Sequence, residues 1–229
     1  MMARDVSICG RKRVRLSNAD GEFERMRPHN LSNRFRQQRM RKFLELVPDG
    51  RPTRILDLGG TAAYWRALPA LYDVPNVEVT VLNLGAEETV DRNLTVRSGD
   101  ACATDLPDMA FDVVHSNSVI EHVGGWSKIE AMAREVRRLA PSYFVQTPNF
   151  WFPIEPHYKL PFVQYLPKRL RRAVTGDDPV RIRLLSAREM MRLFPDAELW
   201  RERWCGLTKS FVAIRVSAEM SRGPAGARI

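Results

Sequence analysis

Cysteine is scarce in this chain: Cys9, Cys102 and Cys205 are its only three cysteines, and they lie far apart. An odd and scattered set excludes a disulfide framework and shows no zinc-binding spacing. Histidine is also scarce, with four residues and no pair at the spacing of metal ligands, so the sequence predicts no metal site. Reduced cysteines are typical of the cytoplasm, which is the location we expect.

Long apolar runs are absent as well. No stretch approaches the roughly 20 consecutive apolar residues of a membrane span, and the basic N-terminal residues lack the apolar segment of a secretory signal. The net charge of +9 is unevenly distributed, because residues 1–42 and 157–192 are basic whereas residues 43–156 are acidic. The basic segments indicate either an anionic substrate or contact with a membrane surface, and the alternative is ordinary solvated charge.

Short β-branched or apolar runs alternate with amphipathic segments along the chain. Strands are predicted at residues 54–60, 77–83, 94–100, 111–117 and 142–146, with a closing antiparallel pair at 198–205 and 210–216. Helices are predicted at residues 32–47, 62–72, 126–139 and 187–194. This alternation predicts an α/β fold of the Rossmann-like, doubly wound type: a mostly parallel sheet with helices on both faces and an antiparallel closing strand.

The same pattern divides the chain into three parts. Residues 1–31 are predicted to form a basic flexible arm, residues 32–217 the folded domain, and residues 218–229 a disordered tail. Within the domain, residues 148–185 form a proline-rich insertion with interleaved aromatic and basic residues. A connection of this length in a compact domain is usually functional, and we expect it to be a substrate lid.

Four predicted strand ends carry glycine or polar residues. They are Asp57–Thr61 (Asp-Leu-Gly-Gly-Thr), Asn83-Leu84, Gly99–Ala101 and Ser116–Ser118, the last followed by Val-Ile-Glu-His-Val. Ligands of open α/β sheets bind at the carboxyl ends of the strands. Glycine there lets the backbone approach a ligand closely, and Asn83 lies at the spacing from the glycine loop where such folds bind a ribose.

The order of these signatures resembles the class I S-adenosylmethionine-dependent methyltransferases, in particular the bacterial group called methyltransferase type 11. The resemblance covers residues 32–216. It implies S-adenosylmethionine as the cofactor and S-adenosylhomocysteine as its product. The glycine loop would lie beside the methionine moiety, the second strand end at the ribose, the third at the adenine, and the fourth at the site of methyl transfer. The cofactor-binding residues implied are Asp57, Gly59, Gly60, Thr61, Asn83, Leu84, Asp100, Ala101 and Asn117.

Two departures from the family pattern bear on function. Thr61 and Ala63 occupy positions where the family has glycine, and Asn83 occupies one where it has Asp or Glu. An amide can accept one ribose hydroxyl but supplies no second carboxylate oxygen. A catalytically silent cofactor-binding regulatory protein is therefore an alternative to an enzyme. An RNA methyltransferase is a further alternative, favoured by the net charge alone.

Candidate catalytic residues follow from the chemistry of the acceptor. A hydroxyl acceptor benefits from a general base, and histidine has a suitable pKa. His157, with Glu155 as its orienting partner, and His122 after the fourth strand are the candidates, whereas His115 within a strand is expected to be structural. A loop histidine bonded to backbone is the alternative for His122. We expect methylation of a small-molecule or lipid- or glycan-linked acceptor, at a hydroxyl.

The aromatic and basic insertion admits three functional interpretations: a lid, a membrane contact for a lipid-linked acceptor, or a nucleic-acid platform. A small helical subdomain that covers its own apolar residues is the non-functional alternative. The lid is favoured, and nucleic acid is disfavoured because no recognised RNA-binding module accompanies the insertion.

Arg39 lies on the apolar stripe of the first predicted helix, four residues from both Phe35 and Phe43. An inward arginine costs desolvation unless it meets an anion. The carboxylate of the cofactor's methionine moiety is one candidate partner, which would make Arg39 a cofactor-binding residue. The alternative is an aliphatic stem on the core with its charged head in water.

Overall fold

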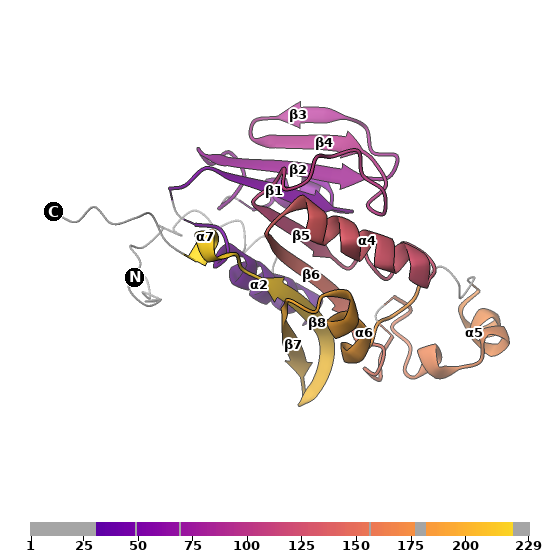
Figure 1. The fold of residues 1–229 in the computed structure, drawn as a ribbon. Helices are drawn as coiled ribbons and strands as arrows, with labels where there is room; N and C mark the ends of the chain where they lie inside the picture. Colours follow the sequence, from indigo (N-terminus) through magenta and orange to yellow (C-terminus); the bar gives the residue numbers. More distant parts are fainter. Residues whose placement is uncertain (1–30, 49, 69, 156, 177–181, 222–229) are drawn as a thin grey trace, which may run out of the picture.

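The computed structural model describes residues 31–48, 50–68, 70–155, 157–176 and 182–221 of the chain (Figure 1). The basic arm predicted for the N-terminus lies outside the described residues, apart from its last residue. The tail beyond residue 221 lies outside them as well.

An eight-stranded sheet forms the centre of the fold, in the order β3-β4-β2-β1-β5-β6-β8-β7. Its strands are β1 (Thr53–Leu58), β2 (Val77–Asn83), β3 (Thr89–Asp91), β4 (Leu94–Ser98), β5 (Val113–Asn117), β6 (Ser142–Pro148), β7 (Glu198–Trp204) and β8 (Leu207–Arg215). The strands from β4 to β6 in this order pair in parallel, whereas β3, β8 and β7 pair antiparallel with their neighbours. The predicted mostly parallel sheet with an antiparallel closing strand is confirmed.

Helices cover both faces of this sheet (Figure 1). On one face lie α4 (Trp126–Leu139) and α6 (Ala187–Leu193), and on the other α2 (Leu31–Leu44), α3 (Ala62–Arg66) and α7 (Ala218–Ser221). The buried residues of α4 recur at helical spacing, which is why this helix packs along its length. A complete capping box between Ser186 and Glu189 begins α6.

Side chains of β1 alternate between the two layers. Leu56 and Leu58 belong to the core beneath α4 and α6, whereas Ile55 belongs to the core beneath α2 and α3. Because the side-chain period of a strand is two, Asp57 must point to the same face as Ile55. Its carboxylate therefore lies on the face of the sheet that α2 and α3 cover, where it contacts Trp65.

Three elements differ from the sequence prediction. Strand β3 forms between the predicted strands at 77–83 and 94–100, where the sequence analysis predicted neither a strand nor a helix. Helix α3 ends at Arg66 rather than near residue 72, since Pro69 disfavours helical backbone at the residue before it. At the C-terminus, α7 extends the ordered chain into the predicted tail, because Met220 is buried in the core beneath α2.

The insertion after β6 contains two short helical segments, η1 (Val163–Tyr165) and α5 (Lys168–Thr175). Figure 1 shows α5 standing out from the body of the protein, on the side where the parallel strands end. No residue of α5 is buried. Among the described residues, no helix is long and apolar enough to cross a membrane.

Candidate functional site

The loop after β1 depends on two glycines. Gly59 has a φ of +80°, and a Cβ atom there would lie 2.4 Å from Cγ1 of Val119 in the loop after β5. A side chain at this position would therefore be strained and would also collide with its neighbour. Gly59 lets the loops after β1 and β5 meet at the switch point of the sheet, where open α/β folds bind their ligands.

The carboxylate of Asp57 packs directly against Gly60 of this loop. One carboxylate oxygen accepts a hydrogen bond from Trp65 Nε1 at 2.6 Å, and the other lies 2.9 Å from His115 Nδ1. All three side chains are buried. A Cβ on Gly60 would overlap the Asp57 carboxylate, so glycine is required there for packing. Asp57 thus joins β1 to α3 and β5 by hydrogen bonds within the protein, and His115 is structural, as the sequence predicted.

Asn83, at the end of β2, ties the glycine loop to the neighbouring strand. Its Nδ2 donates to the carbonyl oxygen of Gly60 at 2.9 Å. This bond leaves the amide oxygen as the acceptor that a ribose hydroxyl would meet. Leu84 beside it is 79% exposed. Thr61 caps α3, its hydroxyl accepting from the backbone N–H of Tyr64, which accounts for threonine where a glycine was expected.

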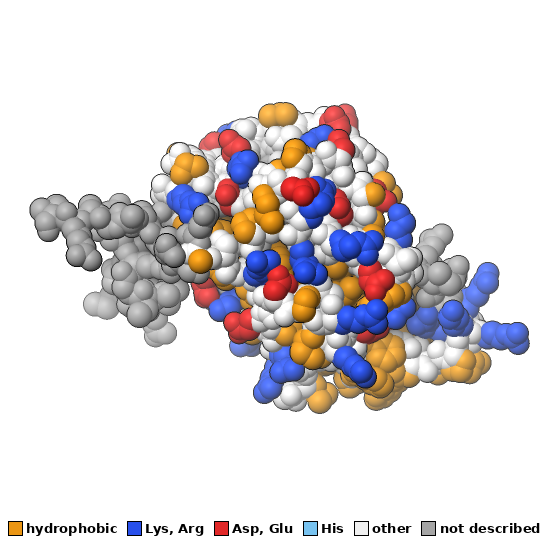
Figure 2. All heavy atoms as spheres, viewed as in Figure 1, with side chains coloured by type: hydrophobic (Ala, Val, Ile, Leu, Met, Phe, Trp, Pro, Cys, Tyr) orange, Lys and Arg blue, Asp and Glu red, His pale blue; other side chains and the backbone are white. Residues whose placement is uncertain are grey.

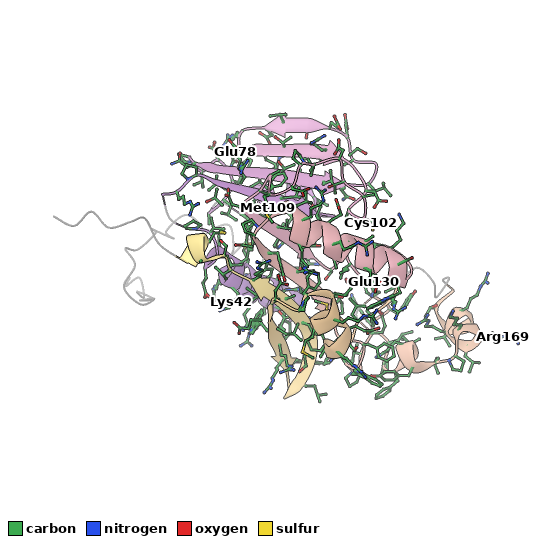
Figure 3. All side chains as sticks on the ribbon, in the orientation of Figure 1. Lys42, Glu78, Cys102, Met109, Glu130 and Arg169 are labelled. Carbon is green, nitrogen blue, oxygen red and sulfur yellow. The ribbon has the colours of Figure 1, made fainter. Side chains whose placement is uncertain are left out.

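Asp100 organises the turn after β4. Its Oδ1 accepts from the backbone N–H of Cys102 at 2.8 Å, and its Oδ2 lies 3.2 Å from Lys128 Nζ on α4. The hydrogen bond from Cys102 and the nearby Lys128 hold the pKa of Asp100 below its usual value despite partial burial. Figure 3 shows Cys102 beside α4, so this turn is held against that helix. Ala101 packs against the same core.

Asn117, the last residue of β5, carries a buried Oδ1 with no hydrogen-bond partner among the described residues. Buried polar atoms are normally satisfied, so an orphaned acceptor at a strand end indicates a ligand. Together with the glycine loop and the amide oxygen of Asn83, it fits a cofactor that brings hydroxyl and amino donors.

Arg39 is buried, as its place on the apolar stripe predicted, with 8% of its surface exposed. The Nε atom of its guanidinium is buried, without a hydrogen-bond partner among the described residues. Its Nε lies 3.5 Å from Oε1 of Glu202 on β7, and Glu202 is itself buried. Burial lowers the pKa of Arg39, although the charge of Glu202 opposes this. The sequence did not identify Glu202, and contact of Arg39 with the cofactor stays a prediction.

A second group of side chains lies beyond the end of β5 and joins the loop after this strand to the insertion. His157 Nδ1 lies 2.6 Å from Oε1 of Glu155, whose other oxygen accepts from the backbone N–H groups of His157 and Tyr158. Glu155 is buried and orients the imidazole ring. The Glu155–His157 pairing that the sequence suggested is present in the structure.

His122 completes this group from the other side. Its Nε2 lies 3.0 Å from Nε2 of His157, with the two rings nearly perpendicular. His122 therefore faces a side chain rather than backbone. Glu121, one residue earlier, is fully buried and accepts from the hydroxyl of Thr147 with one oxygen. Its other oxygen lies 4.0 Å from His122 Nε2 and has no hydrogen-bond partner among the described residues.

Burial and the hydrogen bonds and charges within this group together set the pKa values of its members. Burial raises the pKa of Glu121 to about 7 and, together with the neighbouring His157, lowers the pKa of His122. Burial would also lower the pKa of His157, but its hydrogen bond to Glu155 and that carboxylate's charge raise the pKa above its usual value. The converse applies to Glu155, whose pKa is lowered by the bonds it accepts in spite of burial.

Sequence reasoning assigned no role to Glu121, although it adjoins His122 in the motif after the fourth predicted strand. A carboxylate in an otherwise apolar run was the available signal. The sequence also gave no indication that His122 and His157, 35 residues apart, would meet.

Comparison with known proteins bears on the identity of the domain. Residues 56–142 match the model of a family described as a methyltransferase domain. The chain therefore contains a methyltransferase domain of the S-adenosylmethionine-dependent type. No curated protein sequence matches the methyltransferase significantly.

Solved structures of low sequence identity share its fold. The PH0226 protein of Pyrococcus horikoshii OT3 is 17% identical, with a TM-score of 0.53, over 84% of this chain and 97% of that one. A chain from the complex of the Haloferax volcanii Trm112 methyltransferase activator with a methyltransferase is 15% identical, with a TM-score of 0.50, over 86% and 94%. The Haemonchus contortus phosphoethanolamine N-methyltransferase 2, crystallised with S-adenosyl-L-methionine, is 16% identical, with a TM-score of 0.50, over 72% and 38%.

Proposed function

We propose that the methyltransferase transfers the methyl group of S-adenosylmethionine to a hydroxyl of its acceptor, and that the acceptor binds between the end of β5 and the insertion. The contact of His122 with His157, anchored by Glu155, carries this proposal. It sets two imidazole nitrogens next to the strand end where the family resemblance places methyl transfer. Oxygen acceptors need such groups more than amine acceptors do, because a hydroxyl must lose its proton.

The cofactor residues proposed are those of the loop after β1 and of the ends of β2, β4 and β5. Asn83 would accept from the ribose through its amide oxygen, and Asp100 from the adenine amino group. Asn117 would satisfy its orphaned oxygen. The bound cofactor supplies a methyl group already activated by its sulfonium. The protein then has to hold the acceptor oxygen in line with that group and exclude water.

Proton removal is the step that the cluster would perform. Since Nδ1 of His157 donates to Glu155, its Nε2 keeps the lone pair. His157 would take the hydroxyl proton as the acceptor oxygen bonds to the methyl carbon and the carbon–sulfur bond breaks. His122 would hold the same oxygen from the other side.

Release of S-adenosylhomocysteine from panels of hydroxylated small molecules, lipid-linked glycans and structured RNA tests this function. We expect turnover with a hydroxyl acceptor to fall at least 100-fold in His157→Gln, while affinity for S-adenosylhomocysteine changes by less than twofold. Lys159→Ala is the matched control, since this exposed side chain of the same loop lies outside the cluster. Cofactor binding without turnover on any panel would favour the silent regulatory protein, and turnover on RNA alone would favour the RNA methyltransferase.

The exposed side chains of the insertion favour an acceptor that is presented at a membrane surface. The apolar ones include Trp151, Phe162, Leu166, Leu170 and Val174. Leu170 and Val174 lie four residues apart, on one side of α5, and Lys168, Arg169, Arg171 and Arg172 supply positive charge. Figure 2 shows apolar and basic side chains side by side over this segment, and in Figure 3 Arg169 extends away from the sheet.

Such a helix fits an anionic membrane surface and a lipid-linked acceptor. We expect the protein to sediment with phosphatidylglycerol vesicles, less at high salt, and Leu170→Ser/Val174→Ser to lose this binding. Equal binding to phosphatidylcholine vesicles would exclude the electrostatic contact, and binding to neither kind of vesicle would leave the insertion as a lid.

A further inference from the structure

The side chains of Glu121, His122 and His157 turn three ligating atoms toward one another. One atom from each lies within 4.8 Å of the other two. They come from two segments that the fold joins beyond the end of β5, so their spacing in the sequence gave no metal signature. We propose that these three residues bind a divalent transition-metal ion and that this ion holds the oxygen of the methyl acceptor.

The distance between the two imidazoles supports a shared ion. Two ligands 3.0 Å apart, each about 2.0–2.1 Å from a metal ion, subtend an angle of roughly 91–97° at the ion, close to the angle between neighbouring ligands of an octahedral site. His157 already donates Nδ1–H to Glu155, which directs its Nε2 lone pair into the cluster. A carboxylate behind a ligating histidine is the usual outer partner of a metal site.

Glu121 is the second, independent observation. Its side chain is fully buried, yet one carboxylate oxygen has no hydrogen-bond partner among the described residues and lies 4.0 Å from His122 Nε2. An uncompensated buried carboxylate oxygen is costly, and a cation would satisfy it. Two ligands of one ion lie at most about 4.2 Å apart, so Glu121 would need to move by less than about 1 Å to bind.

Ligand chemistry indicates the class of metal. Two imidazoles and one carboxylate favour zinc, iron or manganese over magnesium or calcium, which prefer oxygen ligands. Three protein ligands leave positions open for a substrate oxygen. This inference rests on the proposed hydroxyl acceptor and refines the role of His157: with the ion bound, its Nε2 is a ligand. The ion would lower the pKa of the acceptor hydroxyl, whose proton would then pass to water.

Zn²⁺ titration of the chelator-treated full chain, followed by calorimetry, tests the site apart from activity. Cys205→Ser serves as the background, because this exposed thiol could bind zinc itself. We expect one ion to bind, and Glu121→Gln and His157→Gln each to weaken this binding at least tenfold. Glu155→Gln, which leaves all three ligands in place, should weaken it 10- to 100-fold. Glu130→Gln, a partly exposed carboxylate on α4, should leave it unchanged.

Binding of S-adenosylhomocysteine by each variant shows that the fold is intact, and Glu121→Gln also keeps a partner for Thr147. Absence of Zn²⁺ binding, or equal binding by the background protein and all three cluster variants, would overturn the proposal. Specific metal binding without turnover of any acceptor would count against the proposed function alone. Turnover that resists chelation, together with absent metal binding, would overturn the metal site and keep the proposed function.

Discussion

Replacement of Gly59 by alanine tests the assignment of the cofactor site to the switch point of the sheet. The substitution adds two separate costs. At a φ of +80° a Cβ atom costs about 1–2 kcal/mol. At 2.4 Å from Cγ1 of Val119 it also collides with the loop after β5, and overpacking of this kind costs about 1–3 kcal/mol. We expect a total destabilisation of about 2–5 kcal/mol from these two terms.

Gly206 is the matched control for the first term. It has the same φ of +80°, but nothing lies within 4 Å of where its Cβ would be. Gly206→Ala should therefore cost only about 1–2 kcal/mol. Val119→Ala removes the colliding methyl groups, so the double variant with Gly59→Ala should recover the second term. This recovery would appear in a double-mutant cycle as a coupling energy of about 1–3 kcal/mol.

Urea unfolding of the four proteins in the cycle measures stability, and calorimetry with S-adenosylhomocysteine measures affinity. Gly59→Ala should bind the ligand at least tenfold more weakly, because Val119 must move at the edge of the proposed site. Gly206→Ala lies in the turn between β7 and β8, outside the proposed site, and should bind as the unmodified protein does. A coupling energy within about 0.5 kcal/mol of zero would refute the collision. Unchanged affinity in a folded Gly59→Ala protein would refute the cofactor site.

Two further predictions concern buried and partly buried ion pairs. Arg39→Met should destabilise the protein by about 3–5 kcal/mol, because it strands the Glu202 carboxylate, and Arg39→Met/Glu202→Gln should lose less. If Arg39 also contacts the cofactor's carboxylate, the single variant should lose affinity for S-adenosylhomocysteine but keep its affinity for methylthioadenosine. Unchanged affinity for both ligands would limit the role of Arg39 to its pairing with Glu202. Hydrogen bonds from Arg138 and Thr104 lower the pKa of Glu135 to about 2 from an ordinary 4.5, so its stabilising effect is complete above pH 4.5 and lost as the pH falls toward 2. Glu135→Gln should cost about 2 kcal/mol at pH 7 in urea unfolding, and a constant difference down to pH 2 would contradict the pairing.

The elements that the sequence determined are those specified by neighbouring residues. The β-branched alternation of residues 77–83 marks β2, and the capping box at Ser186 begins α6, because both signals operate within one turn or one pleat. The alternation of such elements in turn predicted a parallel sheet with binding residues at its carboxyl edge. Asn83, Asp100 and Asn117 lie at that edge as expected.

Only the tertiary structure decided which distant side chains meet. Binding of the cofactor by Asp57 stays a prediction, whereas the contacts of its carboxylate with Trp65 and His115 follow from the alternation of β1 and from the packing around it. Arg39 contacts Glu202, and His122 contacts His157, although these residues lie too far apart in the sequence for a local pattern to predict the contacts. The sheet order and the path of the insertion set these contacts. Local periodicity in the sequence shows on which helix or strand each residue lies. The packing of these helices and strands then determines which side chain it contacts.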